Sequence, residues 1–282
     1  MKYVNFLFLS FLFAGCVKDI PTLEERKINV LSTALKNSFE EVDIKTSTFS
    51  LFSLQKKSLD CKNKTLNVYV ESDGLAWLSR TTISKDPTPI DSTILKLIYE
   101  DKNECKVYLA RPCQFINSNS CNSSYWTNKR FSKEVVQSYD ETLNQLKTKY
   151  KNKNFNLIGH SGGGAIATIL ASKRTDINNL ITIAGNLDIQ KWVQIHKISE
   201  LEGSLNPSDY TKKLESINQY HFIGTNDKII PKEVFFSYYS KFNRKDKIKY
   251  KLYEQEHNCC WVEPFKELIN RWKRVSKTLF SF

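Results

Sequence analysis

Phe155-Asn156-Leu157-Ile158-Gly159-His160-Ser161-Gly162-Gly163-Gly164-Ala165-Ile166-Ala167 is the stretch that decides the fold of this chain. A short apolar run, a Gly-x-Ser-x-Gly turn and a run of small residues predict a buried strand, a sharp turn and a tightly packed helix. Such a nucleophile elbow exposes Ser161 Oγ and directs the Gly162 N–H and the helix dipole at the position of an oxyanion. The alternative is a Gly-rich turn without a chemical role.

Apolar strands alternate with helical patterns on both sides of the elbow. We expect strands at 44–54, 66–70, 105–110, 180–184, 220–224 and 248–253, and helices at 23–39, 92–99, 132–149, 162–173 and 263–277. This alternation predicts an α/β fold with a mostly parallel twisted sheet and helices on both faces. The polar segment 192–210 is expected to form a small cap or lid. Residues 42–282 are predicted to be one domain, preceded by a tether and helix at 16–41.

The first residues resemble an export signal rather than part of the domain. Lys2 precedes an apolar run from Phe6 to Phe13, and the run ends in Ala14-Gly15-Cys16. This ending resembles the bacterial lipobox, with Phe13 in the position where Leu is usual. We expect residues 1–15 to be a signal peptide, Cys16 to be acylated, and the protein to be exported and lipid-anchored in the cell envelope. An ordinary signal peptide with an incidental Cys16 is the alternative.

Six cysteines remain when Cys16 is set aside, an even number in a chain that is predicted to reach an oxidising compartment. Cys61 and Cys105 each precede a strand, and these strands are expected to be neighbours, so the two residues are one candidate disulfide. Cys113 and Cys121 close a short loop and are the second candidate. Other connectivities remain open, as does the role of Cys259-Cys260. The spacing does not fit a zinc site, and no metal is expected.

The net charge of +12 comes from lysines that are scattered along the chain. No nucleic-acid-binding motif and no basic helix with interleaved aromatic residues is present. We therefore expect no nucleic-acid partner.

A serine nucleophile needs an imidazole base, and the chain has four histidines. His160 lies inside the elbow beside the nucleophile, His196 falls in the expected cap, and His221 lies within a strand as an expected core residue. His257 follows the last strand in a loop, which makes it the candidate base.

The base in turn needs a carboxylate. Asp227 follows the penultimate strand and is the candidate acid, while Asp188, after the strand that succeeds the elbow, is the backup. Ser161, Asp227 and His257 then follow one another in the order expected of a Ser-Asp-His triad.

A second oxyanion donor is expected in the loop after the 66–70 strand, which reads Glu71-Ser72-Asp73-Gly74-Leu75. We expect the Leu75 N–H to act together with the Gly162 N–H. The alternative is a simple Gly turn between strand and loop.

From about Thr65 to Trp272 the chain resembles the α/β-hydrolase superfamily, on the elbow and the order of the three triad residues. It is also similar to bacterial α/β-hydrolase-like proteins of unassigned substrate. It shares with them 73–77 (Asp-Gly-Leu-Ala-Trp), 86–89 (Asp-Pro-Thr-Pro), 109–114 (Leu-Ala-Arg-Pro-Cys-Gln), 184–188 (Ala-Gly-Asn-Leu-Asp) and 203–207 (Gly-Ser-Leu-Asn-Pro). The superfamily resemblance implies Ser161, Asp227 and His257 as triad. Asp73 departs from the usual His.

These observations together predict a serine hydrolase that cleaves an ester, thioester or amide, most similar to carboxylesterases and lipases. A small-molecule or lipid-like acyl substrate, the membrane as partner through the N-terminal anchor, and no metal or organic cofactor are expected. An acyltransferase with the same triad, a catalytically silent binding lipoprotein and a structural lipoprotein are the alternatives. Arg80 and Arg111 are either anion-binding residues of the pocket or structural salt-bridge partners.

Overall fold

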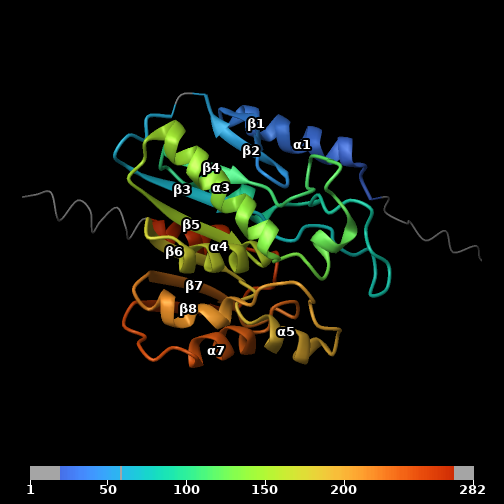
Figure 1. The fold of residues 1–282 in the computed structure, drawn as a ribbon, viewed down its shortest axis with the longest axis vertical. Helices are drawn as coiled ribbons and strands as arrows, with labels where there is room; N and C mark the ends of the chain where they lie inside the picture. Colours follow the sequence, from blue (N-terminus) through green and yellow to red (C-terminus); the bar gives the residue numbers. More distant parts are fainter. Residues whose placement is uncertain (1–19, 58, 270–282) are drawn as a thin grey trace, which may run out of the picture.

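The computed structural model describes residues 20–57 and 59–269, and its centre is one eight-stranded sheet. The order of strands is β1-β2-β4-β3-β5-β6-β7-β8, from top to bottom in Figure 1. Strands β3 to β8 run parallel, whereas β1 and β2 pair antiparallel at one edge. The strands are β1 Phe39–Lys45, β2 Ser50–Lys56, β3 Thr65–Val70, β4 Lys106–Leu109, β5 Asn154–His160, β6 Ile177–Ile183, β7 Asn218–Gly224 and β8 Ile248–Tyr253.

Helices cover both faces of this sheet. One hydrophobic core joins the sheet to α3 and α4, with α6 and α7 further along, and a second joins the opposite face to α1, α2 and the helical residues 262–269. The α-helices are α1 Leu23–Lys36, α2 Thr93–Glu100, α3 Lys133–Tyr150, α4 Gly162–Lys173, α5 Ile189–His196, α6 Thr211–Leu214 and α7 Lys232–Ser240. The predicted α/β fold class is confirmed.

The strand expected at 44–54 was wrong, because the chain reverses within it. The N–H of Thr46 donates to the carbonyl of Phe49 at 2.8 Å, and the Thr46 hydroxyl donates to the same oxygen. This turn divides the segment into β1 and β2, so the sheet already includes residues before 42.

Two predictions fall at the chain ends. The signal peptide and Cys16 lie outside the described residues, as do positions beyond 269 of the expected 263–277 helix. Within the described part of the chain, no helix has the length and hydrophobicity needed to cross a bilayer.

Candidate active site

Ser161 occupies a sharp turn between β5 and α4. Its φ is 54° and its ψ is −120°, a backbone conformation that residues other than glycine rarely adopt. Close packing explains why the flanking residues are glycines. A Cβ on Gly159 would lie 2.3 Å from the carbonyl of Gly163, and a Cβ on Gly163 would lie 2.3 Å from the carbonyl of Val70. The predicted strand, turn and helix are therefore all present.

A line of hydrogen bonds joins Ser161, His257 and Asp227. Asp227 Oδ2 accepts from His257 Nδ1 at 2.8 Å, so the proton of the neutral ring is on Nδ1. Nε2 is then free to accept from Ser161 Oγ at 2.9 Å. The side chains of His257 and Asp227 are 9% and 0% exposed, which shields both bonds from water. The structure thus brings together the three residues that the sequence nominated from three different loops.

Asp227 is itself held in place by backbone amides. Its Oδ1 accepts from the N–H groups of Ile229 and Ile230, each at 2.8 Å. Because Oδ1 is occupied in this way, Oδ2 stays directed at the imidazole of His257.

The backup acid, Asp188, does not reach the imidazole. Its carboxylate accepts from Ser237 Oγ at 2.7 Å and from the Lys191 N–H at 3.2 Å, and it pairs with Lys241 at 3.0 Å. Asp188 is the N-cap of α5, so its position after a strand reflects a helix start.

His160 contacts the main chain of the candidate base, His257. Its Nε2 donates to the main-chain carbonyl of His257 at 2.9 Å, and the two rings lie 4.9 Å apart. Trp261 Nε1 donates to the same carbonyl at 2.9 Å. Burial, with a smaller contribution from His257, lowers the pKa of His160 to about 3, so the ring is neutral at physiological pH. Sequence reasoning missed this role because the contact spans 97 residues.

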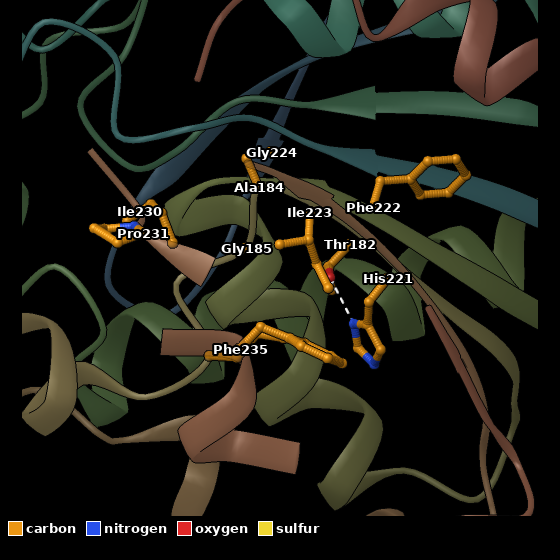
Figure 2. A pocket seen from close by; sticks show the side chains of 11 residues that line it. Thr182, Ala184, Gly185, His221, Phe222, Ile223, Gly224, Ile230, Pro231 and Phe235 are labelled. Carbon is orange, nitrogen blue, oxygen red and sulfur yellow. Dashed lines mark hydrogen bonds between the residues drawn. The ribbon is translucent and has the colours of Figure 1, made fainter. Parts of the chain in front are cut away.

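The other two histidines lie away from Ser161. His221 lines a small pocket together with Ile230, Pro231 and Phe235 (Figure 2), and Thr182 Oγ1 donates to its Nδ1 at 2.7 Å. Burial lowers the pKa of His221 to about 3, as expected of a core histidine. His196 donates from Nε2 to the carbonyl of Ile229 and so joins α5 to the Asp227 loop.

The expectation for Leu75 needs correction, because its amide is already committed. The Leu75 N–H donates to the carbonyl of Pro87 at 3.0 Å. By contrast, the N–H groups of Asp73 and Gly162 make no hydrogen bond to another described residue. In the pairing of β3 with β5, Val70 lies opposite Gly159, and Asp73 and Gly162 each follow three residues later. The Gly162 amide directly follows Ser161, and the side chain of Asp73 lies against Gly162, so the amides of Gly162 and Asp73 are the candidates for an oxyanion site.

The side chain of Asp73 lies against the elbow between two arginines. A Cβ on Gly162 would be 2.2 Å from its Oδ1, which shows how close the carboxylate is. Arg111 pairs with Oδ1 at 2.8 Å and Arg130 with Oδ2 at 3.1 Å. Burial favours a raised pKa, but the charges of Arg130 and Arg111 outweigh it and hold the pKa of Asp73 below its ordinary value.

This ion cluster decides between the two alternatives for Arg111 but not for Arg80. Arg111 is only 4% exposed and is a salt-bridge partner. Arg80 is exposed in the loop between β3 and α2. Neither Asp73 as an ion-pair partner nor Arg130 as a functional residue was found from the sequence, since no local pattern marks a contact across 57 positions.

A buried glutamate fixes the start of the same loop. Glu71 is fully buried, and its carboxylate accepts from the Ser72 N–H at 2.7 Å, from the Tyr108 hydroxyl at 2.9 Å and from the Ser92 hydroxyl. Burial raises its pKa although these hydrogen bonds oppose the shift. Tyr108 of β4 and Ser92 at the start of α2 thus anchor Glu71 to the body of the domain, just before the loop that leads to Asp73.

Three cysteine pairs are disulfide-bonded in the structure. Cys61–Cys105 joins the segments that lead into β3 and β4, and Cys113–Cys121 closes the short loop after β4. The adjacent Cys259 and Cys260 form the third pair, close to His257 in the chain. Among the described residues no group of three or more His, Cys, Asp or Glu side chains is arranged to hold a metal ion.

The expected cap region contacts the loop that carries Asp227. Helix α5 lies in this region, and Trp192 Nε1 donates to the carbonyl of Ile229 at 2.8 Å. Arg130 lies over the ring of Trp192, with 5.8 Å between its Cζ and the ring centroid. The region from α5 onward therefore borders the site through Trp192.

Comparison with known proteins agrees with this geometry. A family model described as alpha/beta hydrolase fold matches residues 115–222, which include the elbow. A search of curated protein sequences gave no significant match.

Solved structures share the overall fold at low sequence identity. An esterase from Pyrococcus furiosus has a TM-score of 0.58 and 14% identity, over 86% of this chain and 94% of that chain. An alpha-beta serine hydrolase homologue from Coxiella burnetii has a TM-score of 0.54 and 12% identity, over 82% and 96%. Est1E from Butyrivibrio proteoclasticus has a TM-score of 0.55 and 12% identity, over 84% and 99%. These likenesses establish the fold, and the neighbours themselves include esterases and a serine hydrolase homologue.

Proposed function

Because this chain has the α/β-hydrolase fold, we propose that it is a serine hydrolase that cleaves an ester, thioester or amide through an acyl-enzyme. The observation that carries the proposal is the hydrogen-bonded line from Ser161 through His257 to Asp227. The donor and acceptor roles in these hydrogen bonds suit the reaction, since the Asp227 carboxylate accepts the Nδ1 proton of His257 and leaves His257 Nε2 as the base.

In the proposed mechanism Ser161 Oγ attacks the carbonyl carbon of the substrate while His257 Nε2 takes the hydroxyl proton. The imidazolium is stabilised by the charge of Asp227 and returns the proton to the leaving group, which departs as an alcohol, thiol or amine. A water molecule then attacks the acyl-enzyme with the same base, and the acid product leaves with Ser161 restored.

The oxyanion of each tetrahedral intermediate would be held by the amides of Gly162 and Asp73. A lone carboxylate at about 4 Å from an oxyanion would repel it by about 4 kcal/mol at an effective dielectric constant of about 20. Arg111 and Arg130 remove this problem by giving the cluster a net positive charge. Asp73 is thus compatible with the loop where related sequences have His.

We further propose that the protein acts in the cell envelope on a small or lipid-like acyl ester, as a carboxylesterase or lipase. The esterases among the structural neighbours support the ester, and the lipobox-like end at Cys16 supports a lipid anchor. The Cys61–Cys105 and Cys113–Cys121 pairs are consistent with export, since disulfides persist in oxidising compartments.

The first test is labelling of the full chain with a fluorophosphonate probe, which reacts with activated serines. We compare the parent with Ser161→Ala and His257→Ala, and we use Ser32→Ala as the matched control because Ser32 is exposed on α1. Labelling in the parent and the control, with loss in the other two, is the expected result. A folded parent that takes no label would contradict the proposal and favour a silent binding protein. Circular dichroism of each variant checks that it is folded.

A further inference from the structure

An apolar hairpin, residues 75–84, projects from the loop between β3 and α2. Trp77, Leu78 and Ile83 on it are 40%, 48% and 39% exposed. The hairpin is internally bonded, because Trp77 bridges to Ile83 and the Leu78 N–H donates to the carbonyl of Thr82 at 2.8 Å. Three large apolar side chains are therefore held in solvent by an ordered backbone. An exposed apolar group of this kind usually marks a contact surface.

The base of the apolar hairpin adjoins the proposed oxyanion loop. The Leu75 N–H donates to the carbonyl of Pro87, and a Cβ on Gly74 would lie 2.0 Å from the same oxygen. The other side of the base is fastened to the body by Trp126, whose Nε1 donates to the carbonyl of Ser84 at 3.1 Å. Asp73, immediately before Gly74, lies against Gly162. The hairpin thus stands at the border of the site that contains Ser161.

The start of α1 packs on the same loop. Arg26, only 6% exposed, pairs with Asp86 at 3.4 Å and donates to the carbonyl of Thr88. In Figure 1 the first turn of α1 and the loop between β3 and α2 lie on the same side of the molecule. The described chain begins at Ile20, four residues after Cys16. Four extended residues span at most about 14 Å, so a lipid on Cys16 would keep a bilayer close to this side.

The charge around the apolar residues is positive. Residues 75–85 contain Arg80 and Lys85, both exposed, and contain no acidic residue. Tryptophan favours the interface between water and hydrocarbon, and cationic side chains favour anionic headgroups. This combination fits a lipid surface better than the dry interface of a second protein chain, where charged residues are depleted.

We propose that the apolar hairpin inserts Trp77, Leu78 and Ile83 into the interfacial layer of an anionic lipid bilayer. Arg80 and Lys85 then contact the headgroups, and the oxyanion loop at the base of the hairpin faces the bilayer. As far as substrate is concerned, this inference rests on the proposed function: it implies esters with an acyl chain that is supplied from the membrane. The insertion itself does not depend on catalysis.

The experiment uses the full chain, purified as the cell processes it and mixed with vesicles of phosphatidylcholine containing about a third phosphatidylglycerol. The phosphatidylcholine is brominated near the top of one acyl chain and quenches nearby tryptophan. We expect quenching at least about twofold greater in the parent than in Trp77→Phe. Equal quenching in the two proteins would overturn the proposal, as would a dimer in which Trp77 is protected from the lipid.

A second pair of variants tests the consequence for substrate. Leu78→Ser/Ile83→Ser removes apolar residues of the hairpin, and Leu35→Ser/Leu252→Ser removes two exposed apolar residues outside it as the control. We expect only the first pair to lower the hydrolysis of vesicle-borne esters, by about fivefold or more, with short soluble esters cleaved at the parental rate. Equal loss in both pairs, or no loss, would contradict a lipid-supplied substrate. If no ester is cleaved by any protein, the proposed function fails while the quenching result still decides insertion.

Discussion

His160 donates a hydrogen bond from Nε2 to the main-chain carbonyl of His257 at 2.9 Å, and thereby connects the nucleophile turn to the loop of the base. His160 directly precedes Ser161, so this hydrogen bond ties the backbone of His257 to the turn that carries the nucleophile. The geometry of the bond between His257 Nε2 and Ser161 Oγ depends on this contact, because the ring of His257 moves with its own main chain.

We predict that His160→Phe lowers kcat/KM for a short ester by about 10- to 100-fold, since a small displacement of a catalytic group has an effect of that size. Trp261→Phe should lower kcat/KM in the same direction, because it removes the other donor to the His257 carbonyl. Steady-state kinetics on both variants, normalised to the fraction that a fluorophosphonate labels, is the measurement.

His221→Phe is the matched control for that series, as His221 is equally buried and neutral but bonds Thr182 instead. It should lose stability without losing kcat/KM per labelled molecule. With its pKa at about 3, His160 stays neutral above about pH 4, so its removal should leave the acid limb of the pH profile in place. An unchanged kcat/KM in His160→Phe would show that the contact does not position the base.

Asp73→Asn tests the ion cluster at the oxyanion loop. The variant removes the charge that faces both Arg111 and Arg130, and we expect the free energy of unfolding at pH 7 to fall by about 3 kcal/mol. The folded-state pKa of Asp73 lies below its ordinary value of 3.8, so its contribution is present above about pH 4 and is lost as the pH falls below that. Urea unfolding of parent and variant at several pH values should therefore show a gap that narrows in acid.

Asp176→Asn is the control for that prediction. Asp176 pairs with Arg174 and Lys147 on another part of the surface and also has a lowered pKa, again with burial opposing the shift. It should reproduce the pH-dependent loss of stability but leave kcat unchanged, whereas Asp73→Asn should lower kcat as well. Parental kcat in Asp73→Asn would argue against a role of this loop in holding the oxyanion.

Kinetics of Asn variants distinguishes the two candidate acids, Asp227 and Asp188. Asp227→Asn should lower kcat by about 10⁴-fold, because the imidazole then loses its correct tautomer. Asp188→Asn should change kcat less than about tenfold and lower the melting temperature, because it removes the charge that pairs with Lys241 and disturbs the oxygen that accepts from Ser237. A larger loss of kcat in Asp188→Asn than in Asp227→Asn would show that Asp188 is the catalytic acid.

The Cys61–Cys105 and Cys113–Cys121 disulfides should contribute unequally to stability. Cys61–Cys105 spans 44 positions and Cys113–Cys121 spans 8, so the chain-entropy relation gives about 4 and about 2.5 kcal/mol. Paired Cys→Ser variants, unfolded in urea with the oxidised parent as reference, measure both values. A larger loss of unfolding free energy for Cys113–Cys121 would show that this pair acts chiefly on the local fold of the loop it closes.

Much of the fold was accessible from the sequence because the signals are local. The Gly-x-Ser-x-Gly turn, the helix at 92–99 and the apolar strands each occupy a few neighbouring positions, and all three recur in the structure. The hairpin formed by β1 and β2 at the sheet edge was not predicted, because the turn between Thr46 and Phe49 contains no Gly or Pro to mark it.

By itself the sequence determined the strand–turn–helix at Ser161 and the order in which Ser161, Asp227 and His257 follow their strands. Backbone sterics and side-chain periodicity act over short distances, so such features survive without knowledge of the rest. Only the tertiary structure decided that the Leu75 amide is taken by Pro87, that Arg111 and Arg130 neutralise Asp73, and that His160 holds His257. Each of these depends on which distant groups the packed sheet brings within hydrogen-bond reach, a property that no local pattern encodes.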